Sequence, residues 1–348
     1  MLQNTFRTVY QRHRPLFLGY GMVLLWLTAT AMHIPDGFLS LAVAIVFWIL
    51  TVIAVGYALS RVRTELNERQ VPVMGVLASV IFAGQMLNFS VSGGTSGHLL
   101  GAALASILLG PWPALLVMTC VVSVQALIFQ DGGLLALGAN IFNMGVIGVF
   151  VAWGVYRLIR RLTPDTRWSQ LLAGFLAAWS SIEIAALVAA LQLALSGTSP
   201  ANIAVPAMGG IHALIGLGEG LITLGALSFL MAVRPGLLSG TGPEKSESTL
   251  VWIGGLAIAL LLTVLSPLAS AHPDGLEWVA EQTGFLDAAQ VSTYKIIPDY
   301  AVPGISNGTL ATILAGVLGV AIVLIAALLI SRFRKSLSPG DGGLRVRR

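Results

Sequence analysis

The sequence is poor in charged residues and in cysteine. Asp, Glu, Lys and Arg make up 10% of its 348 residues, and 56% are hydrophobic, with a mean hydropathy of +0.87. Soluble domains carry roughly 25% charged residues. A soluble enzyme, a disordered chain and a nucleic-acid-binding protein are therefore excluded, although the pI is about 9.5. The single cysteine, Cys120, lies in an apolar run, which excludes an internal disulfide and a cysteine metal cluster.

Lysine is scarce as well, and two catalytic motifs are missing from the sequence. None of the three lysines completes a Gly-x-x-x-x-Gly-Lys-Ser/Thr loop, so the chain has no nucleotide-binding P-loop. If ATP drives its activity, the ATPase must be a separate chain. The absence of a His-Glu-x-x-His motif argues against a membrane metalloprotease.

Long apolar runs are the main feature that the sequence does have. A helix needs roughly 20 apolar residues to cross a bilayer. Pro111 and Pro113 interrupt one such run, so we expect a short helical pair there, at 98–110 and 113–129. The predicted fold class is all-α, a polytopic membrane bundle with about seven spans up to residue 235 and two C-terminal spans. The other expected spans are 38–60, 72–91, 134–156, 170–195, 204–232, 249–270 and 308–331.

Positive charge predicts the orientation of these spans. Sixteen Lys and Arg residues follow residue 31, and alternation of the spans leaves only Lys295 on the external side. This pattern follows the positive-inside rule. We expect a multi-pass protein of the bacterial inner membrane, with the mature N-terminus outside and the C-terminus in the cytoplasm. The expected external loops are 92–97, 130–133, 196–203 and 271–307.

The first 31 residues have the pattern of a secretory signal peptide. Three arginines precede a short apolar run, 16–27, which ends in Ala29-Thr30-Ala31. We expect cleavage after Ala31, or an equivalent true start at Met32. The alternative is a short extra helix that stays attached.

A mature chain that begins Met32-His33 offers a chelate for a transition metal. The α-amine of Met32, the amide nitrogen of His33 and a ring nitrogen of His33 would supply three nitrogens in one plane. His98, in another external segment, would complete a square. Square-planar nitrogen ligation suits Ni(II) and Cu(II), and Co(II) can be forced into it. The amide must lose its proton, so binding should weaken as the pH falls. An external loop histidine is otherwise an ordinary solvated residue.

Four separated motifs resemble one membrane protein family. They begin Met32-His33-Ile34-Pro35-Asp36-Gly37-Phe38 and continue at residues 94–101, 131–140 and 210–219. The sequence from 32 to 235 resembles the CbiM/NikM family, the substrate-binding S components of energy-coupling-factor (ECF) transporters for cobalt and nickel. The resemblance implies that Met32, His33 and His98 are the metal ligands.

The C-terminal part resembles the small N-type subunit of the same transporters. Residues 273–277, Pro-Asp-Gly-Leu-Glu, match the PDGLE motif of that subunit. The chain therefore resembles a fused M–N protein. Its expected parts are a signal peptide at 1–31, an S component at 32–235, a cytoplasmic linker at 236–248, a two-span N-type domain at 249–331 and a basic tail at 332–348.

The resemblance also implies a function and partners. We expect a transporter component without enzyme activity or a resident cofactor, whose substrate is Ni(II) or Co(II). Nickel is slightly favoured, and cobalt would link the protein to cobalamin biosynthesis. The implied partners are a transmembrane coupling (T) component and cytoplasmic ATPase subunits, besides membrane lipid, with no nucleic acid. Two rival functions are a metal sensor or assembly protein without transport, and an ATP-independent channel or carrier.

Several other polar residues have two interpretations each. Glu183, His212 and Glu219 lie inside expected spans, where ionisable groups usually face the protein interior. They form either a polar track or partner contact, or a structural hydrogen-bonded network. Asp36 and Asp131 either orient ligand imidazoles or simply form turns. The segment 271–307 has five acidic residues against Lys295 and would attract cations. Its His272 has no second imidazole nearby in the sequence.

Overall fold

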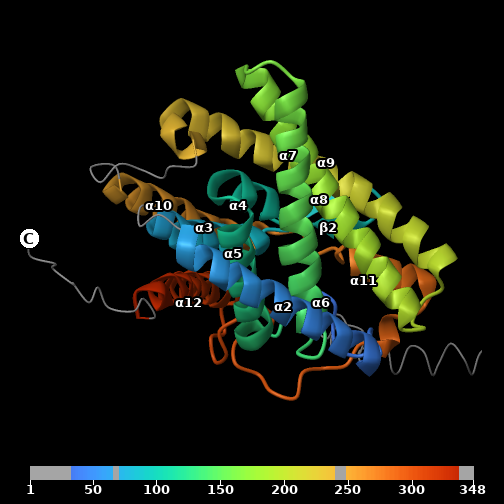
Figure 1. Ribbon diagram of the computed structural model, residues 1–348. Coiled ribbons are helices and arrows are strands. Elements are labelled where there is room, and N and C mark those ends of the chain that lie inside the picture. Colours follow the sequence, from blue (N-terminus) through green and yellow to red (C-terminus); the bar gives the residue numbers. More distant parts are fainter. Residues whose placement is uncertain (1–32, 66–69, 240–247, 337–348) are drawn as a thin grey trace, which may run out of the picture. The chain divides into compact units, whose positions relative to one another are not determined.

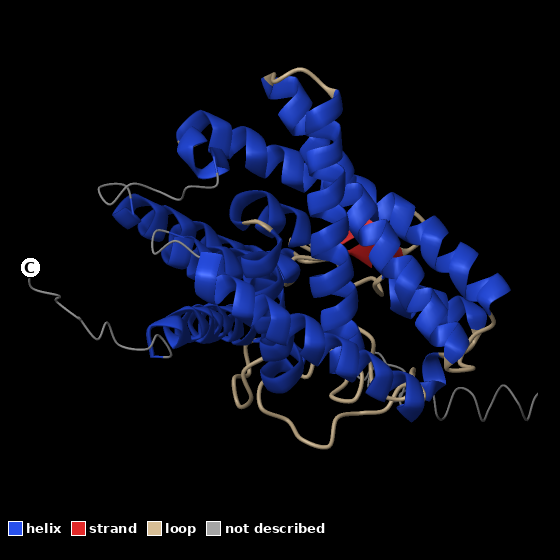
Figure 2. Cartoon of the chain, viewed as in Figure 1, coloured by secondary structure: helices blue, strands red, loops and turns tan. Residues whose placement is uncertain are grey.

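The computed structural model describes residues 33–65, 70–239 and 248–336, which are almost entirely helical (Figure 2). The expected leader 1–31 and Met32 lie outside these residues, as do 240–247 within the expected linker and 337–348 of the basic tail. Among the described residues, seven helices are long and apolar enough to cross a membrane, two of them in the C-terminal part. The predicted class, a polytopic helical membrane protein, is confirmed.

Among the described residues, the N-terminal part has eight α-helices and two short π-helices. They are α2 (Leu41–Glu65), α3 (Gln70–Gln85), α4 (Ala102–Leu109), α5 (Pro111–Val124), η1 (Gln125–Phe129), α6 (Leu137–Ile141), η2 (Phe142–Ile147), α7 (Gly148–Leu162), α8 (Arg167–Leu195) and α9 (Ala201–Val233). The break that Pro111 predicted in the apolar run 98–129 is present. Gly110, at φ 80°, separates α4 from α5, and Pro111 begins α5, where its missing N–H has no cost.

The C-terminal part consists of two long helices joined by a loop segment with short helices. The long helices are α10 (Ser248–Leu265) and α12 (Gly308–Ser336). Between them lie α11 (Gly275–Thr283) and the 3-10 turns η4 (Ser266–Leu268), η5 (Leu286–Ala288) and η6 (Pro298–Tyr300). A further 3-10 turn, η3 (Pro235–Ser239), ends the N-terminal part.

The span expected at 72–91 ends earlier and is followed by a β-hairpin. Helix α3 stops at Gln85, and strands β1 (Phe89–Val91) and β2 (Thr95–Gly97) pair in antiparallel register, with Ser90 opposite Ser96. The turn between them passes through Gly93 and Gly94, at φ 92° and 80°, conformations that glycine adopts without strain. The hairpin places His98 directly after its second strand.

Helices α10 and α12 both pack along α3, so this short helix is almost fully covered (Figure 1). The approach is close at two glycines. A Cβ on Gly255 of α10 would lie 1.9 Å from Cγ1 of Val76, and one on Gly319 of α12 would lie 2.1 Å from Phe82. Small residues at such crossings allow helices in a membrane to approach closely. The C-terminal part is therefore held to the N-terminal part through α3.

Adjacent glycines of α10 test this packing. Gly255→Leu should lower the free energy of unfolding by about 1–3 kcal/mol, because the new side chain overlaps Val76. Gly254→Leu is the control, since a Cβ there meets nothing within 4 Å. Thermal unfolding of the purified protein in detergent measures both. Equal melting temperatures for the two variants would contradict the α3–α10 contact.

Candidate metal centre

The segment after Met32 is fixed in a buried position by the side chain of Asn140 from α6. The amide of Ile34 donates to Oδ1 of Asn140 at 3.0 Å, and Nδ2 of Asn140 donates back to the Ile34 carbonyl at 3.0 Å. The Gly133 amide also donates to this carbonyl, at 3.0 Å. Both groups of the Ile34 backbone are thus satisfied inside the protein. His33 beside it is 3% exposed.

Asp36 holds the following turn and serves as a structural cap. Its carboxylate accepts from the amides of Leu134, Leu135 and Ala136 at 3.0, 2.8 and 3.0 Å. These amides precede α6, where a carboxylate is favourable for free N–H groups. Of the two interpretations of Asp36, the turn-forming one agrees with the structure.

Asp131 instead contacts the imidazole of His33. Oδ1 of Asp131 lies 2.8 Å from Nδ1 of His33, and the hydroxyl of Tyr300 donates to Oδ2 at 2.5 Å. Burial raises the pKa of Asp131, but the charge and hydrogen bond of His33, together with the Tyr300 hydrogen bond, outweigh it and lower the pKa below its usual value. Asp131 is therefore a buried carboxylate anion that orients His33.

The second ring nitrogen of His33, Nε2, differs from the first in its contacts. Nε2 is buried and has no hydrogen-bond partner among the residues that the structure describes. A buried nitrogen without a partner is costly. The ring of His98 lies close by, with 6.0 Å between the two ring centroids and 40° between the planes. Two imidazoles on one ion have centroids at most about 6.4 Å apart. The structure thus brings together the two histidines predicted as ligands.

The loop that carries His98 is fixed by Glu219 of α9. This fully buried carboxylate accepts from the amides of Leu100 and Gly101 at 2.8 and 3.0 Å. Nδ1 of His98 lies 3.0 Å from the carbonyl of Leu99. For Glu219 the structural interpretation is the one that the contacts support, and its effect is to hold His98 in place.

A cavity of about 90 Å³ lies beside the two histidines. Its walls include His33, His98, His212 and Asp274, together with Asn143 and Met144 from the π-helix η2. Within the described residues, no three His, Cys, Asp or Glu side chains are grouped as ligands of one ion. An ion here would therefore have the two imidazoles of His33 and His98 and would need backbone or terminal nitrogens as its other ligands.

His212 and Glu183 differ from Glu219 in their contacts. Nδ1 of His212 lies 2.8 Å from the Met208 carbonyl, one turn back in α9, and its ring packs against Gly275 of the C-terminal part. Oε2 of Glu183 in α8 is buried and has no hydrogen-bond partner among the described residues. His212 belongs to the cavity wall, while Glu183 does not line the cavity.

Residues of the C-terminal part also reach the site, and the sequence analysis assigned none of them a role there. Tyr300 contacts Asp131, and Asp274 lines the cavity at 5% exposure. Oδ1 of Asp274 caps α11 by accepting from the Glu277 amide at 2.8 Å, and burial raises the pKa of this carboxyl to about 6. Asp274 entered the sequence analysis only as part of the PDGLE motif and of the acidic segment 271–307, and no pattern in the sequence indicated Tyr300.

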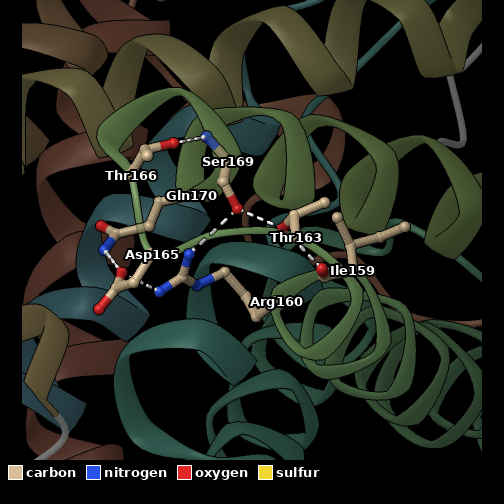
Figure 3. A network of polar contacts seen from close by, with 7 residues as sticks. All are labelled: Ile159, Arg160, Thr163, Asp165, Thr166, Ser169 and Gln170. Carbon is tan, nitrogen blue, oxygen red and sulfur yellow. Dashed lines mark hydrogen bonds and ion pairs between the residues drawn. The ribbon is translucent and has the colours of Figure 1, made fainter.

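The basic turn between α7 and α8 forms a separate polar network (Figure 3). The Arg160 guanidinium donates to Oγ of Ser169 at 3.1 Å and pairs with Asp165. Thr166 caps α8 by accepting from the Ser169 amide. This network fixes the turn and accounts for Arg160, one of the residues of the positive-inside pattern.

Fold and site together define a helical membrane protein with a buried imidazole, His33, and a half-buried one, His98, beside a small cavity. The family model "Cobalt uptake substrate-specific transmembrane region" matches residues 33–237, and the model "PDGLE domain" matches residues 249–336. The chain belongs to the CbiM family of nickel and cobalt transporters and has a PDGLE domain fused behind the CbiM region.

Relatives and solved structures agree with this assignment. The chain is 36% identical over 308 residues to the "Putative fused nickel transport protein NikMN" of Archaeoglobus fulgidus, covering 88% of this chain and 100% of the relative. It is 31% identical to the "Fused nickel transport protein NikMN" of Rhodobacter capsulatus, covering 84% and 95%. A crystal structure described as a truncated transition metal transporter matches with a TM-score of 0.52 and 34% identity, covering 57% of this chain and 98% of that one.

The Glu219 anchor gives a test of the site. Glu219→Gln should cost about 1–3 kcal/mol of stability and weaken Ni(II) binding, because the amide group presents a donor to the amide of Leu100 or Gly101. Glu183→Gln makes the same chemical change in α8 and should leave binding intact. Thermal unfolding and chelator competition measure the two effects. Equal Ni(II) affinities in the two variants would contradict the role of Glu219 in holding the loop that carries His98.

Proposed function

We propose that the protein is the S component of an ECF-type importer and captures Ni(II) or Co(II) outside the cell through Met32, His33 and His98. The observation that supports this most is the close pair of imidazoles, His33 and His98, in which the buried Nε2 of His33 has no hydrogen-bond partner among the described residues. Nitrogen ligands suit nickel and cobalt. The two CbiM-region histidines would supply the side-chain ligands, and the mature N-terminus would supply the others.

The chelate determines which nitrogen of His33 binds the ion. A ring nitrogen can share an ion with the amide of its own residue only through Nδ1, which closes a six-membered ring. In the structure Nδ1 lies 2.8 Å from Oδ1 of Asp131. A half-turn of the ring about Cβ–Cγ brings Nδ1 to the opposite side and Nε2 to the Asp131 side. Asp131 then accepts from Nε2–H while Nδ1 binds the ion, which is the usual carboxylate–histidine–metal arrangement.

Transport by this route needs partner chains. The sequence has no P-loop, so ATP hydrolysis falls to separate cytoplasmic ATPase subunits, coupled through a transmembrane T component. In the proposed orientation, the metal site faces the outside of the bacterial inner membrane and the basic C-terminus faces the cytoplasm. Uptake that needs no ATPase partners would favour a carrier, and binding without uptake would favour a sensor.

Replacement of His98 tests the ligand set. His98→Ala should abolish high-affinity Ni(II) binding, because it removes one of the two imidazoles that lie close together beside the cavity. His272→Ala is the matched control, since this second external histidine has an exposed side chain. Isothermal titration with Ni(II) measures both. Binding that survives His98→Ala would rule out the proposed site.

The free amine of Met32 is a separate requirement. Protein purified from its native membrane should begin at Met32, as N-terminal sequencing or intact mass will show. Three glycines inserted between Ala31 and Met32 should weaken Ni(II) binding, because they move the amine too far from His33 to close adjacent chelate rings while both imidazoles remain. A chain that still begins at Met1 would exclude the terminal chelate.

A further inference from the structure

The external segment of the PDGLE domain covers the metal cavity and its supporting loops. The Ser96 amide donates to the Pro273 carbonyl at 2.8 Å, which extends the hairpin edge. The Gln290 amide donates to the Asp36 carbonyl at 2.7 Å. A Cβ on Gly37 would lie 2.0 Å from the Ala288 carbonyl oxygen. The segment is thus in direct contact with the motif that begins at His33.

Tyr300 is the residue of this segment that hydrogen-bonds the carboxylate in contact with His33. Its hydroxyl donates to one oxygen of Asp131, whose other oxygen contacts His33, so three buried side chains form one chain of hydrogen bonds. Tyr300 is 8% exposed, and Asp131 and His33 are 3% exposed each. With water excluded, the orientation of each group depends on its neighbour.

The position of Tyr300 is held by rings from the CbiM region. Its ring stacks on Phe129 with 4.8 Å between centroids and 14° between planes, and Phe82 of α3 lies 6.1 Å away. Asp299 and Tyr300 both have positive φ, 55° and 52°, a conformation that non-glycine residues rarely adopt. Such backbone persists where surrounding contacts hold it. The segment is therefore shaped to deliver this hydroxyl to Asp131.

We propose that Tyr300 is a positioning residue for metal capture: through Asp131, the PDGLE domain sets the orientation of the His33 imidazole. This inference rests on the proposed function, because it assigns a role to Tyr300 in that same site. The hydroxyl occupies Oδ2 of Asp131 and so directs Oδ1 to His33. Without the Tyr300 hydroxyl, the Asp131 carboxylate loses a hydrogen bond that fixes its orientation. The His33 ring is then held less firmly on the side that faces away from the ion.

A pair of tyrosine variants tests the proposal in the full-length protein. Tyr300→Phe removes the hydroxyl and keeps the stacked ring, and it should weaken Ni(II) binding about tenfold, as loss of an outer hydrogen bond to a metal-binding histidine does. Tyr294→Phe is the matched control. Its hydroxyl donates to the carbonyls of Ala126 and Leu127, in the same interface but away from His33. It should leave the affinity within about twofold of the unsubstituted protein.

Two further measurements distinguish a positioning role of Tyr300 from a general weakening of the contact between the PDGLE domain and the CbiM region. The visible absorption spectrum of bound Ni(II) should change in Tyr300→Phe and stay unchanged in Tyr294→Phe, because only the first alters the His33 ligand. In an Asp131→Ala background, Tyr300→Phe should have no additional effect on affinity, since the hydroxyl has no carboxylate to hold.

The outcomes distinguish this proposal from the proposed function. Wild-type affinity and spectrum in Tyr300→Phe would overturn the positioning role, as would an equal loss in Tyr294→Phe or full additivity with Asp131→Ala. If instead the unsubstituted protein binds no Ni(II), or His98→Ala binds as well as it does, the proposed metal site itself fails.

Discussion

The site depends on keeping an imidazole buried in a defined orientation. A polar ring removed from water must have a partner, and Asp131 supplies one to His33. The backbone around it is satisfied in the same way, by Asn140 at Ile34 and by Glu219 at the loop after His98. Among the described residues, Nε2 of His33 has no hydrogen-bond partner. A polar nitrogen buried in this way is costly, and this nitrogen is the feature on which the proposed function rests.

A membrane restricts where such a site can be built. Irregular backbone is tolerated there only where protein covers it or where it lines a cavity. The two π-helices follow this rule. Helix η1 leads through Gln130, at φ 57°, directly to Asp131, and η2 places Asn143 and Met144 at the cavity. Local departures from the α-helix thus supply the side chains that a regular helix could not direct to the same point.

The sequence predicted what depends on local pattern. Hydropathy predicted the spans, the proline pair predicted the break before α5, and a four-motif resemblance singled out His33 and His98. It did not predict the hairpin at 89–97, because the expected span 72–91 included Phe89–Val91 and the segment 92–97 was expected only as a loop. Nor did it predict Tyr300, which contacts a residue 169 positions earlier in the chain. Contacts at such separations depend on how helices pack, and composition carries no record of that.

Packing within the membrane and the metal site are physically connected through α3. Phe82 of α3 contacts the ring of Tyr300, and the same side chain lies against Gly319 of α12. A movement of α12 along α3 must therefore disturb the aromatic contacts that hold Tyr300 against Asp131. The packing of α12 on α3 and the hydrogen bonds around His33 are thus connected through the ring of Phe82 and the side chain of Tyr300.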